Sequence, residues 1–194
     1  MGLGKLQRRL QPNEKLSGSV SRLFAVSVAQ GPVRGYLVGR SSAAGIAASA
    51  EISLGGQGKV ASTPVEFGTT GTRLLFPEAV SDVPSGAGTR FSTGLTLLNP
   101  QGRAAGTLPL AARVKVSVFD ATGAQRASEE LTLEAGQQVS KLLFADGPDA
   151  GFFRPATMLA GGYVVVTADV PVTGSMLIFT SDLSLMSAVS AQRF

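Results

Sequence analysis

The sequence contains no histidine, no cysteine and no tryptophan, and charged residues make up only 15% of its 194 residues. Without imidazole or thiol groups, the chain cannot hold a Ser-His-Asp triad or a Cys-His nucleophile pair. It cannot form disulfides, and it lacks the nitrogen and sulfur ligands that zinc sites usually need. These absences exclude much of the usual catalytic and metal-binding chemistry.

What is present indicates a globular chain that is rich in turns. Hydrophobic residues reach 44%, with 24 Gly and 10 Pro, which is too apolar for disorder. The longest stretch without a charge, residues 155–168, is shorter than the roughly 18 apolar residues that a membrane helix needs. Residues 1–11 carry basic groups, but no apolar run and cleavage site of a signal peptide follow them. We expect no membrane span, and either a cytosolic chain or a piece of a longer secreted protein.

The positive charge is concentrated in the first third of the chain. Residues 1–62 hold eight basic and two acidic groups, a net +6, whereas residues 63–194 hold nine basic and eleven acidic groups, a net −2. The basic residues are spaced singly, and no aromatic residue is interleaved for base stacking. This spacing favours a solvated face over a nucleic-acid interface, so we expect no nucleic-acid partner.

Strand patterns dominate the second half of the sequence. Ala112–Phe119 alternates apolar and polar residues, Asp120–Gly123 provides a turn, and Glu130–Glu134 alternates again with Leu131 and Leu133 inward, which together predict a β-hairpin. Further strands are expected at Arg73–Phe76, Phe91–Leu98, Tyr163–Ala168, Thr173–Thr180 and Leu185–Ala191. Seven strands between turn signals predict an all-β, antiparallel, immunoglobulin-like β-sandwich. A single helix of one or two turns is expected at Val139–Phe144.

A partial internal repeat underlies this pattern. Leu10–Leu16 aligns without gaps on Leu133–Val139 at an offset of 123 residues, and Gly35–Phe67 aligns without gaps on Gly162–Phe194 at an offset of 127 residues. We therefore expect residues 1–67 to be the C-terminal half of a β-sandwich repeat, 68–72 to be a linker, and 73–194 to be a complete domain. A half-sandwich exposes an apolar face and unpaired strand edges. Either the chain is a fragment, or its start is misplaced, or a neighbouring subunit donates the missing strands.

Several short motifs of the second domain resemble a family. Leu74-Leu-Phe-Pro77, Ser92-Thr-Gly-Leu-Thr-Leu-Leu-Asn-Pro100, Phe119-Asp-Ala-Thr-Gly123 and Ala135-Gly-Gln137 resemble a β-sandwich repeat of secreted and surface proteins of environmental bacteria. The resemblance implies an extracellular stalk, spacer or adhesive module, and it carries over no catalytic residue. Within these motifs, Asn99-Pro100 is expected to end a strand because proline cannot donate to the ladder, and Gly94 to permit close packing or a bulge.

Signatures of catalysis are weak. No serine has the Gly-x-Ser-x-Gly surroundings of a nucleophile elbow, and Gly58-Lys59 is followed by Val60 instead of the Ser or Thr of a P-loop. Gly55–Gly58 is interpreted as a turn between strands.

The remaining candidate residues favour structural roles. Glu129, Glu130 and Glu134 on one hairpin arm fit a solvated strand face better than a carboxylate pair, because Glu130 and Glu134 lie about 13 Å apart along a strand. Asp146 and Asp149 favour a plain turn over a weak Ca²⁺ site. The aromatic side chains of Phe152 and Phe153, next to Arg154, are expected to pack in the core, with a carbohydrate or partner contact as the alternative. Tyr36 and Tyr163, at equivalent places in the two copies, are also interpreted as structural.

The sequence thus predicts a non-enzymatic, extracellular or cell-surface structural or adhesive module of a bacterial protein, with no catalytic residue, cofactor or metal. Its expected partners are other domains or copies of the same chain, with carbohydrate or another surface ligand as a further candidate. The alternative is a self-assembling filament subunit that is completed by strands of a neighbouring chain. The basic first third and the mildly acidic remainder would favour head-to-tail contacts in such a filament.

Overall fold

The computed structural model describes residues 6–11, 14–24, 48–54, 59–65, 70–86, 88–101, 110–147, 149–155 and 157–194. The chain divides into two compact units, Met1–Gly39 and Arg40–Phe194. In the first unit, the described residues include the short helix α1, Val20–Phe24. Among the described residues no helix is long and apolar enough to cross a membrane.

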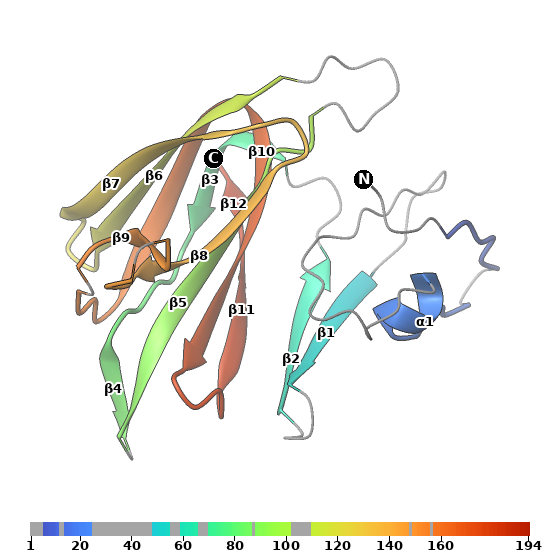
Figure 1. Ribbon diagram of the computed structural model, residues 1–194, viewed down its shortest axis with the longest axis horizontal. Coiled ribbons are helices and arrows are strands. Elements are labelled where there is room, and N and C mark those ends of the chain that lie inside the picture. The colour runs from blue at the N-terminus through green and yellow to red at the C-terminus, as the bar shows by residue number, and fades with distance from the viewer. Residues whose placement is uncertain are drawn as a thin grey trace. The chain divides into compact units, whose positions relative to one another are not determined.

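The second unit is built from strands (Figure 1). Strands β1 (Ala48–Leu54) and β2 (Lys59–Val65) form an antiparallel hairpin that is a separate two-stranded sheet. The remaining strands are β3 (Gly71–Phe76), β4 (Val83–Gly86), β5 (Thr89–Leu98), β6 (Ala112–Asp120), β7 (Gln125–Leu133), β8 (Gln138–Phe144), β9 (Gly151–Phe153), β10 (Gly162–Thr180), β11 (Met186–Ser190) and β12 (Gln192–Arg193).

The long strand β10 belongs to two layers. Its first half lies between β3 and β6 in the order β12-β3-β10-β6-β7, which we call sheet I. Its second half lies between β11 and β5 in the order β11-β10-β5-β8-β9, with β4 also beside β5, which we call sheet II. The pairing with β3 shifts register between Thr167 and Val172, where the strand passes from one sheet to the other. All these pairs are antiparallel except β8–β9.

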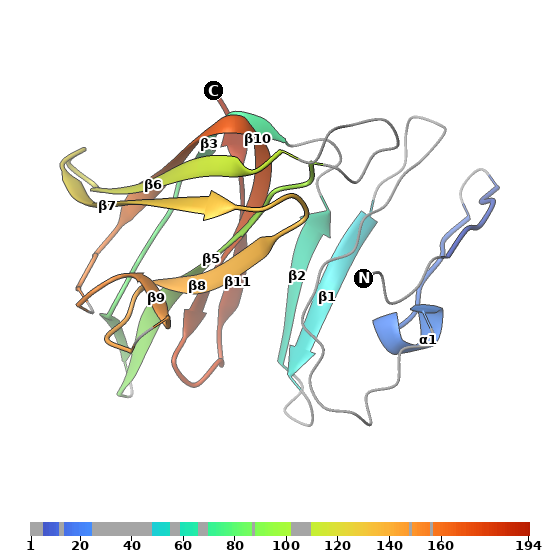
Figure 2. The ribbon, with the colours of Figure 1, turned by 45° about the horizontal axis from the view of Figure 1, so that its top comes forward.

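The two sheets form a nearly closed, barrel-like sheet (Figure 2). On one side β10 passes between the sheets, and beside it β11 in sheet II continues through Ala191 into β12 in sheet I. The core lies between the sheets, because alternate residues of each strand point inward. Its fully buried side chains include Leu74, Phe76, Leu95, Leu97, Val114, Val116, Val118, Leu133, Leu143, Val164, Val166 and Met176.

The all-β fold is confirmed, and so is the predicted hairpin. Val114, Val116 and Val118 are buried, while Arg113 and Lys115 are exposed, as the alternation predicted. The turn is fixed locally because the Asp120 carboxylate accepts hydrogen bonds from the Thr122 N–H at 2.9 Å, the Thr122 hydroxyl at 2.6 Å and the Ala124 N–H at 3.0 Å. Gly123, at φ 85°, supplies the left-handed residue that the turn requires.

The predicted helix at Val139–Phe144 is wrong. This segment is strand β8, which pairs with β5 from Gln138 opposite Leu98 to Leu142 opposite Gly94. Its six residues are too few to stabilise an isolated helix, and the exposed edge of β5 offers them backbone partners. The strands predicted at Tyr163–Ala168 and Thr173–Thr180 are one continuous strand, β10.

Asn99-Pro100 ends strand β5 as predicted, since β5 stops at Leu98. Asn99 is fully buried; its side-chain N–H groups donate to the carbonyls of Leu110 and Leu133 at 2.8 and 2.9 Å, and its side-chain oxygen accepts from the Gln101 N–H at 3.0 Å. The prediction for Gly94 is wrong. The ladder runs through Gly94 without a bulge, and an added methyl group would lie no closer than 3.5 Å to its nearest neighbour, an atom of Phe179.

Candidate functional site

The outward face of sheet I carries a shallow depression of about 280 Å³. It is lined by residues of three neighbouring strands, namely Arg113, Val114 and Lys115 of β6, Glu130 of β7, and Thr167, Ala168 and Asp169 of β10. The register explains this grouping, because Lys115 lies directly opposite Glu130 on one side and Thr167 on the other. Residues that face each other across a ladder share one face of the sheet.

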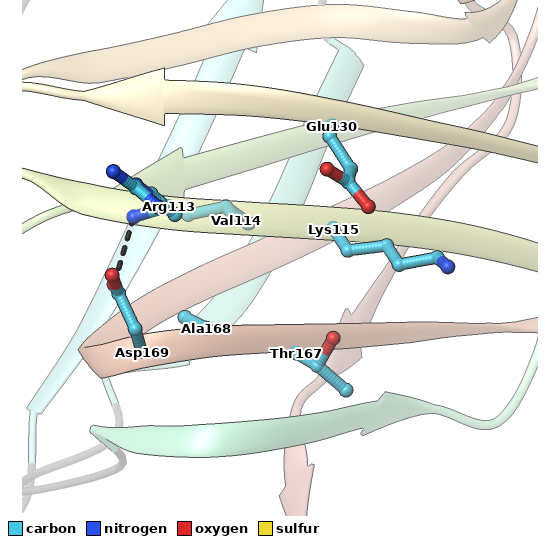
Figure 3. Close-up of a pocket in the computed structure, with 7 residues that line it drawn as sticks. All are labelled: Arg113, Val114, Lys115, Glu130, Thr167, Ala168 and Asp169. Atoms are coloured by element: carbon cyan, nitrogen blue, oxygen red, sulfur yellow. Dashed lines mark hydrogen bonds between the residues drawn. The ribbon is translucent and has the colours of Figure 1, made fainter.

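The charges in this depression are balanced and accessible to solvent. The Arg113 backbone N–H donates to the Asp169 carboxylate at 2.8 Å, and this bond holds Asp169 at the edge of the site. Figure 3 shows Arg113 and Lys115 extending in opposite directions along β6, with Glu130 on one side of Lys115 and Thr167 on the other. The four charged side chains, Arg113, Lys115, Glu130 and Asp169, are all exposed. They offer hydrogen-bond donors and acceptors to a polar ligand on an open surface.

The two acidic residues of the depression come from the strands on either side of β6. Glu130 lies opposite Lys115, and Asp169 is two residues along β10 from Thr167, the other partner of Lys115, which places their Cα atoms about 12 Å apart. The basic Arg113 and Lys115 of β6 lie between the two acidic strands, so the depression combines charges of both signs.

The three predicted glutamates do not share one strand face. Glu130 is exposed on the outward face, as predicted. Glu129 is half-buried opposite the buried Val116, so its side chain faces the interior of the barrel. Glu134 lies beyond the end of β7, where its N–H donates to the Gln137 side chain at 2.7 Å. The alternation in the sequence already places Glu129 inward with Leu131 and Leu133, and this signal was missed.

The acidic loop before β9 forms a turn. The Ala150 N–H donates to the Gly147 carbonyl at 3.2 Å, and the almost fully exposed Asp149 lies 3.8 Å from the Lys141 ammonium. In the part of the chain that the structure describes, no group of three or more acidic side chains is arranged to hold a metal ion. Glycines 55, 56 and 58 with Gln57, and also Tyr36, lie outside the described residues.

The predicted core packing of Phe152 and Phe153 is confirmed. Phe152 and Phe153 are buried, and Phe153 lies 5.4 Å from Phe144 between ring centroids. They belong to the short strand β9. Tyr163 stacks on Phe119, its partner across the ladder, with 5.0 Å between ring centroids.

One carboxylate has a shifted pKa. The hydrogen bond from the Thr122 hydroxyl lowers the pKa of Asp120, and the backbone N–H groups of Ala124 and Thr122 and the charge of Arg126 act in the same direction, against a smaller opposing effect of burial. The Arg126 guanidinium lies 3.6 Å from this carboxylate. Asp120 therefore holds a turn, and its titration is linked to the stability of the hairpin.

The outward face of sheet II differs from that of sheet I. Where β5, β8, β10 and β11 pair with one another, the outward positions that the register assigns carry Ser92, Gly94, Thr96, Leu98, Gln138, Ser140, Leu142, Thr173, Ser175, Leu177, Phe179, Met186, Ala188 and Ser190. None of these described residues is charged, so we call this area the uncharged outward face of sheet II. The charged Arg90 lies beyond it on β5, opposite Pro84 of β4. Leu142, Leu177 and Phe179 are partly exposed. The sequence pattern gave little sign of this face, because its residues come from four strands that are far apart in the chain.

Comparisons with known proteins give little further information. No family model and no curated protein matches the chain. Two solved structures are similar. The Anabaena sensory rhodopsin transducer has 15% identity and a TM-score of 0.38, with 57% of this chain and 99% of that chain covered. The protein Thermotoga maritima 1070 has 11% identity and a TM-score of 0.40, with 62% of this chain and 94% of that chain covered. At these TM-scores neither likeness identifies a function.

Proposed function

We propose that the chain is a non-enzymatic structural or adhesive module of a bacterial surface or secreted protein, built on an immunoglobulin-like β-sandwich. The observation that supports this proposal is the uncharged outward face of sheet II. Burying a charge against another protein costs free energy unless a partner compensates it. Serine, threonine and leucine surfaces of this kind can be buried without that cost. Sheet II therefore suits packing against a neighbouring domain or a second copy of the chain.

The charged depression on sheet I supports a complementary role. Its arginine, lysine, threonine and carboxylate groups can hydrogen-bond to the hydroxyl groups of a carbohydrate or to a polar protein surface. The two outward faces would then serve two purposes, with sheet II joining the module to its neighbours and sheet I contacting a surface ligand.

Location tests the first part of this proposal. Antibody detection after cell fractionation is expected to find the chain on the cell surface or in the medium, and a purely cytosolic signal would contradict it. A hydrolase screen of the purified chain is expected to show no turnover, and turnover that is lost in Glu130→Gln but kept in Glu134→Gln would instead assign an enzymatic role to the depression.

The second candidate function is a self-assembling subunit that is joined to its neighbours through sheet II. The same uncharged face favours it, because copies of one chain can associate through the same surface. Analytical ultracentrifugation at micromolar concentration is expected to show oligomers that Leu177→Lys dissociates, because the substitution places a charge in the middle of the face. Thr132→Lys on sheet I is the control and should leave the oligomers intact. A chain that is strictly monomeric at these concentrations contradicts this candidate.

A further inference from the structure

The strand edges of the barrel differ in how well they are protected against pairing. Natural edge strands avoid association by being very short, by containing proline or a bulge, or by pointing a charge inward. Strand β7 has the inward-facing Glu129, β4 has Pro84 and a register shift, and β9 and β12 have only three and two residues. Strand β11 has five uncharged residues, no proline and a continuous register with β10. Among the described strands of the barrel, its edge is the unprotected one.

The register identifies the backbone groups on this edge. Thr180 lies opposite Leu185 in the register of the β10–β11 pair, and its N–H donates to the Leu185 carbonyl at 3.1 Å. Hydrogen-bonded and non-hydrogen-bonded pairs alternate along an antiparallel ladder. The N–H groups of Ser187 and Val189 therefore face β10, and those of Met186, Ala188 and Ser190 face away from it.

A strand of the same chain lies at this edge. Strand β2 is next to β11 in both views (Figures 1 and 2), although β1 and β2 form a separate sheet. Gly71, the first residue of β3, pairs with Val172 of β10. On the same side of β10, Ser190 of β11 pairs with Ser175. Val172 and Ser175 are three residues apart, so the two pairs lie about 10 Å apart along β10. Val65 at the end of β2 is six residues before Gly71 and can lie up to about 20 Å from it. The connection therefore keeps the end of β2 within reach of the end of β11.

We propose that the β1–β2 hairpin of the same chain adds to sheet II by parallel pairing of Lys59–Thr63 with Met186–Ser190. Both segments have five residues, and Pro64, which has no N–H, interrupts the donor groups of β2 directly after the first of them. The 127-residue offset of the internal repeat aligns these same segments, Lys59 with Met186 and Thr63 with Ser190. A two-stranded hairpin is only marginally stable by itself, so pairing with a larger sheet stabilises it.

In this arrangement β2 covers the edge of β11, to which another chain could otherwise add a strand. In the paired state, a second copy finds no free N–H or carbonyl groups on β11. This goes beyond both proposed functions, because neither identifies what occupies this edge. Its tests are made on the purified full-length chain, so their outcome is independent of cell location.

Amide hydrogen exchange, followed by NMR on the ¹⁵N-labelled chain, tests the pairing. The Ala188 amide is expected to exchange slowly in the wild type, and Ala61→Pro should accelerate it about tenfold or more, because proline interrupts β2. The Val189 amide, which bonds to β10, should keep its rate and so shows that the barrel stays folded. Pro64→Ala is the control, since it restores a donor and should leave Ala188 protected. Equal, fast exchange of Ala188 in the wild type and in Ala61→Pro would overturn the proposal.

A spin label distinguishes the chain's own hairpin from that of a second copy. Because the chain has no cysteine, Ser62→Cys can be labelled at a single site. A labelled ¹⁵N chain diluted in unlabelled ¹⁴N chain should show broadened signals for Met186–Ser190. An unlabelled ¹⁵N chain mixed with labelled ¹⁴N chain should show none. Broadening in the second sample alone would assign the pairing to another copy, and broadening in neither would remove β2 from the edge; both results overturn the proposal.

Discussion

Two glycines in neighbouring strands of sheet II give a sharp test of the packing. Gly174 of β10 points into the barrel, where an added methyl group would lie 2.8 Å from the Thr96 carbonyl oxygen, 2.8 Å from Leu97 Cδ2 and 3.1 Å from Phe76 Cζ. Gly94 of β5 points outward, where the nearest atoms, on Phe179 and Lys141, would be 3.5 and 3.9 Å away. The same substitution should therefore have opposite effects at the two sites.

The magnitudes follow from these distances. Replacing glycine by alanine lowers the entropy of the unfolded chain, which stabilises the fold by about 0.4–1 kcal/mol where the new side chain fits. Gly94→Ala should gain about that amount. At Gly174 the methyl group meets a backbone carbonyl and a core side chain, and overpacking of this kind costs about 1–3 kcal/mol. Gly174→Ala should therefore destabilise the fold by about 1–2 kcal/mol.

Urea denaturation followed by far-UV circular dichroism measures both variants. Thermal melts should agree, with a shift of about 2–4 °C for each kcal/mol in a unit of this size. Because the two variants undergo the same chemical change in paired strands, their difference isolates packing. If Gly174→Ala is as stable as Gly94→Ala, β10 does not have the inward and outward assignment that defines the two faces of sheet II.

Three further predictions concern the core, a turn and an edge. Asn99→Ala should destabilise the fold by about 2–4 kcal/mol, because it leaves the Leu110 and Leu133 carbonyls and the Gln101 N–H without their partner. Urea titration measures this, and an unchanged unfolding midpoint would contradict it. The lowered pKa of Asp120 contributes stability that is present above the pKa of the unfolded chain and is lost as pH falls through the folded value; Asp120→Asn should remove this acid dependence, and a melting profile between pH 5 and pH 2 that keeps its shape would argue against it. Glu129→Val should increase light scattering at fixed concentration, because it removes the inward charge of edge strand β7. Glu130→Val makes the same change in net charge on the outward face and should scatter less. Equal scattering by the two variants would show that net charge alone prevents association.

Local signals were enough to predict part of the fold. The β6–β7 hairpin follows from the alternation over Ala112–Phe119 and Glu130–Glu134 and from a turn whose hydrogen bonds all lie within Asp120–Ala124. The end of β5 at Asn99-Pro100 was predictable because proline has no N–H to donate to the ladder, which is a property of the residue itself. The burial of Phe152 and Phe153 followed from their size and apolar character.

The candidate surfaces were less accessible to sequence reasoning. The depression on sheet I combines residues of β6, β7 and β10, and Glu130 became part of it only because Lys115 lies opposite Glu130 and Thr167. The uncharged face of sheet II combines four strands, and no single strand shows that its neighbours also lack charge. The alternation alone places the Glu129 side chain inward. Only the sheet order shows that β7 is an edge strand, in which an inward charge opposes pairing with another chain.

Composition and short-range pattern by themselves determined that this is an all-β chain without histidine or cysteine chemistry, because these properties depend on residue types and on neighbours a few positions apart. The tertiary structure decided which strands became neighbours. Segment 138–144 is a strand because β5, some forty residues earlier, offers it a ladder. β10 is one strand because β3 and β6 pair with its first half and β5 and β11 with its second. Backbone hydrogen bonds between distant segments have no signature in the local sequence, and they set the sheet order, the edges and the two outward faces on which the proposed functions rest.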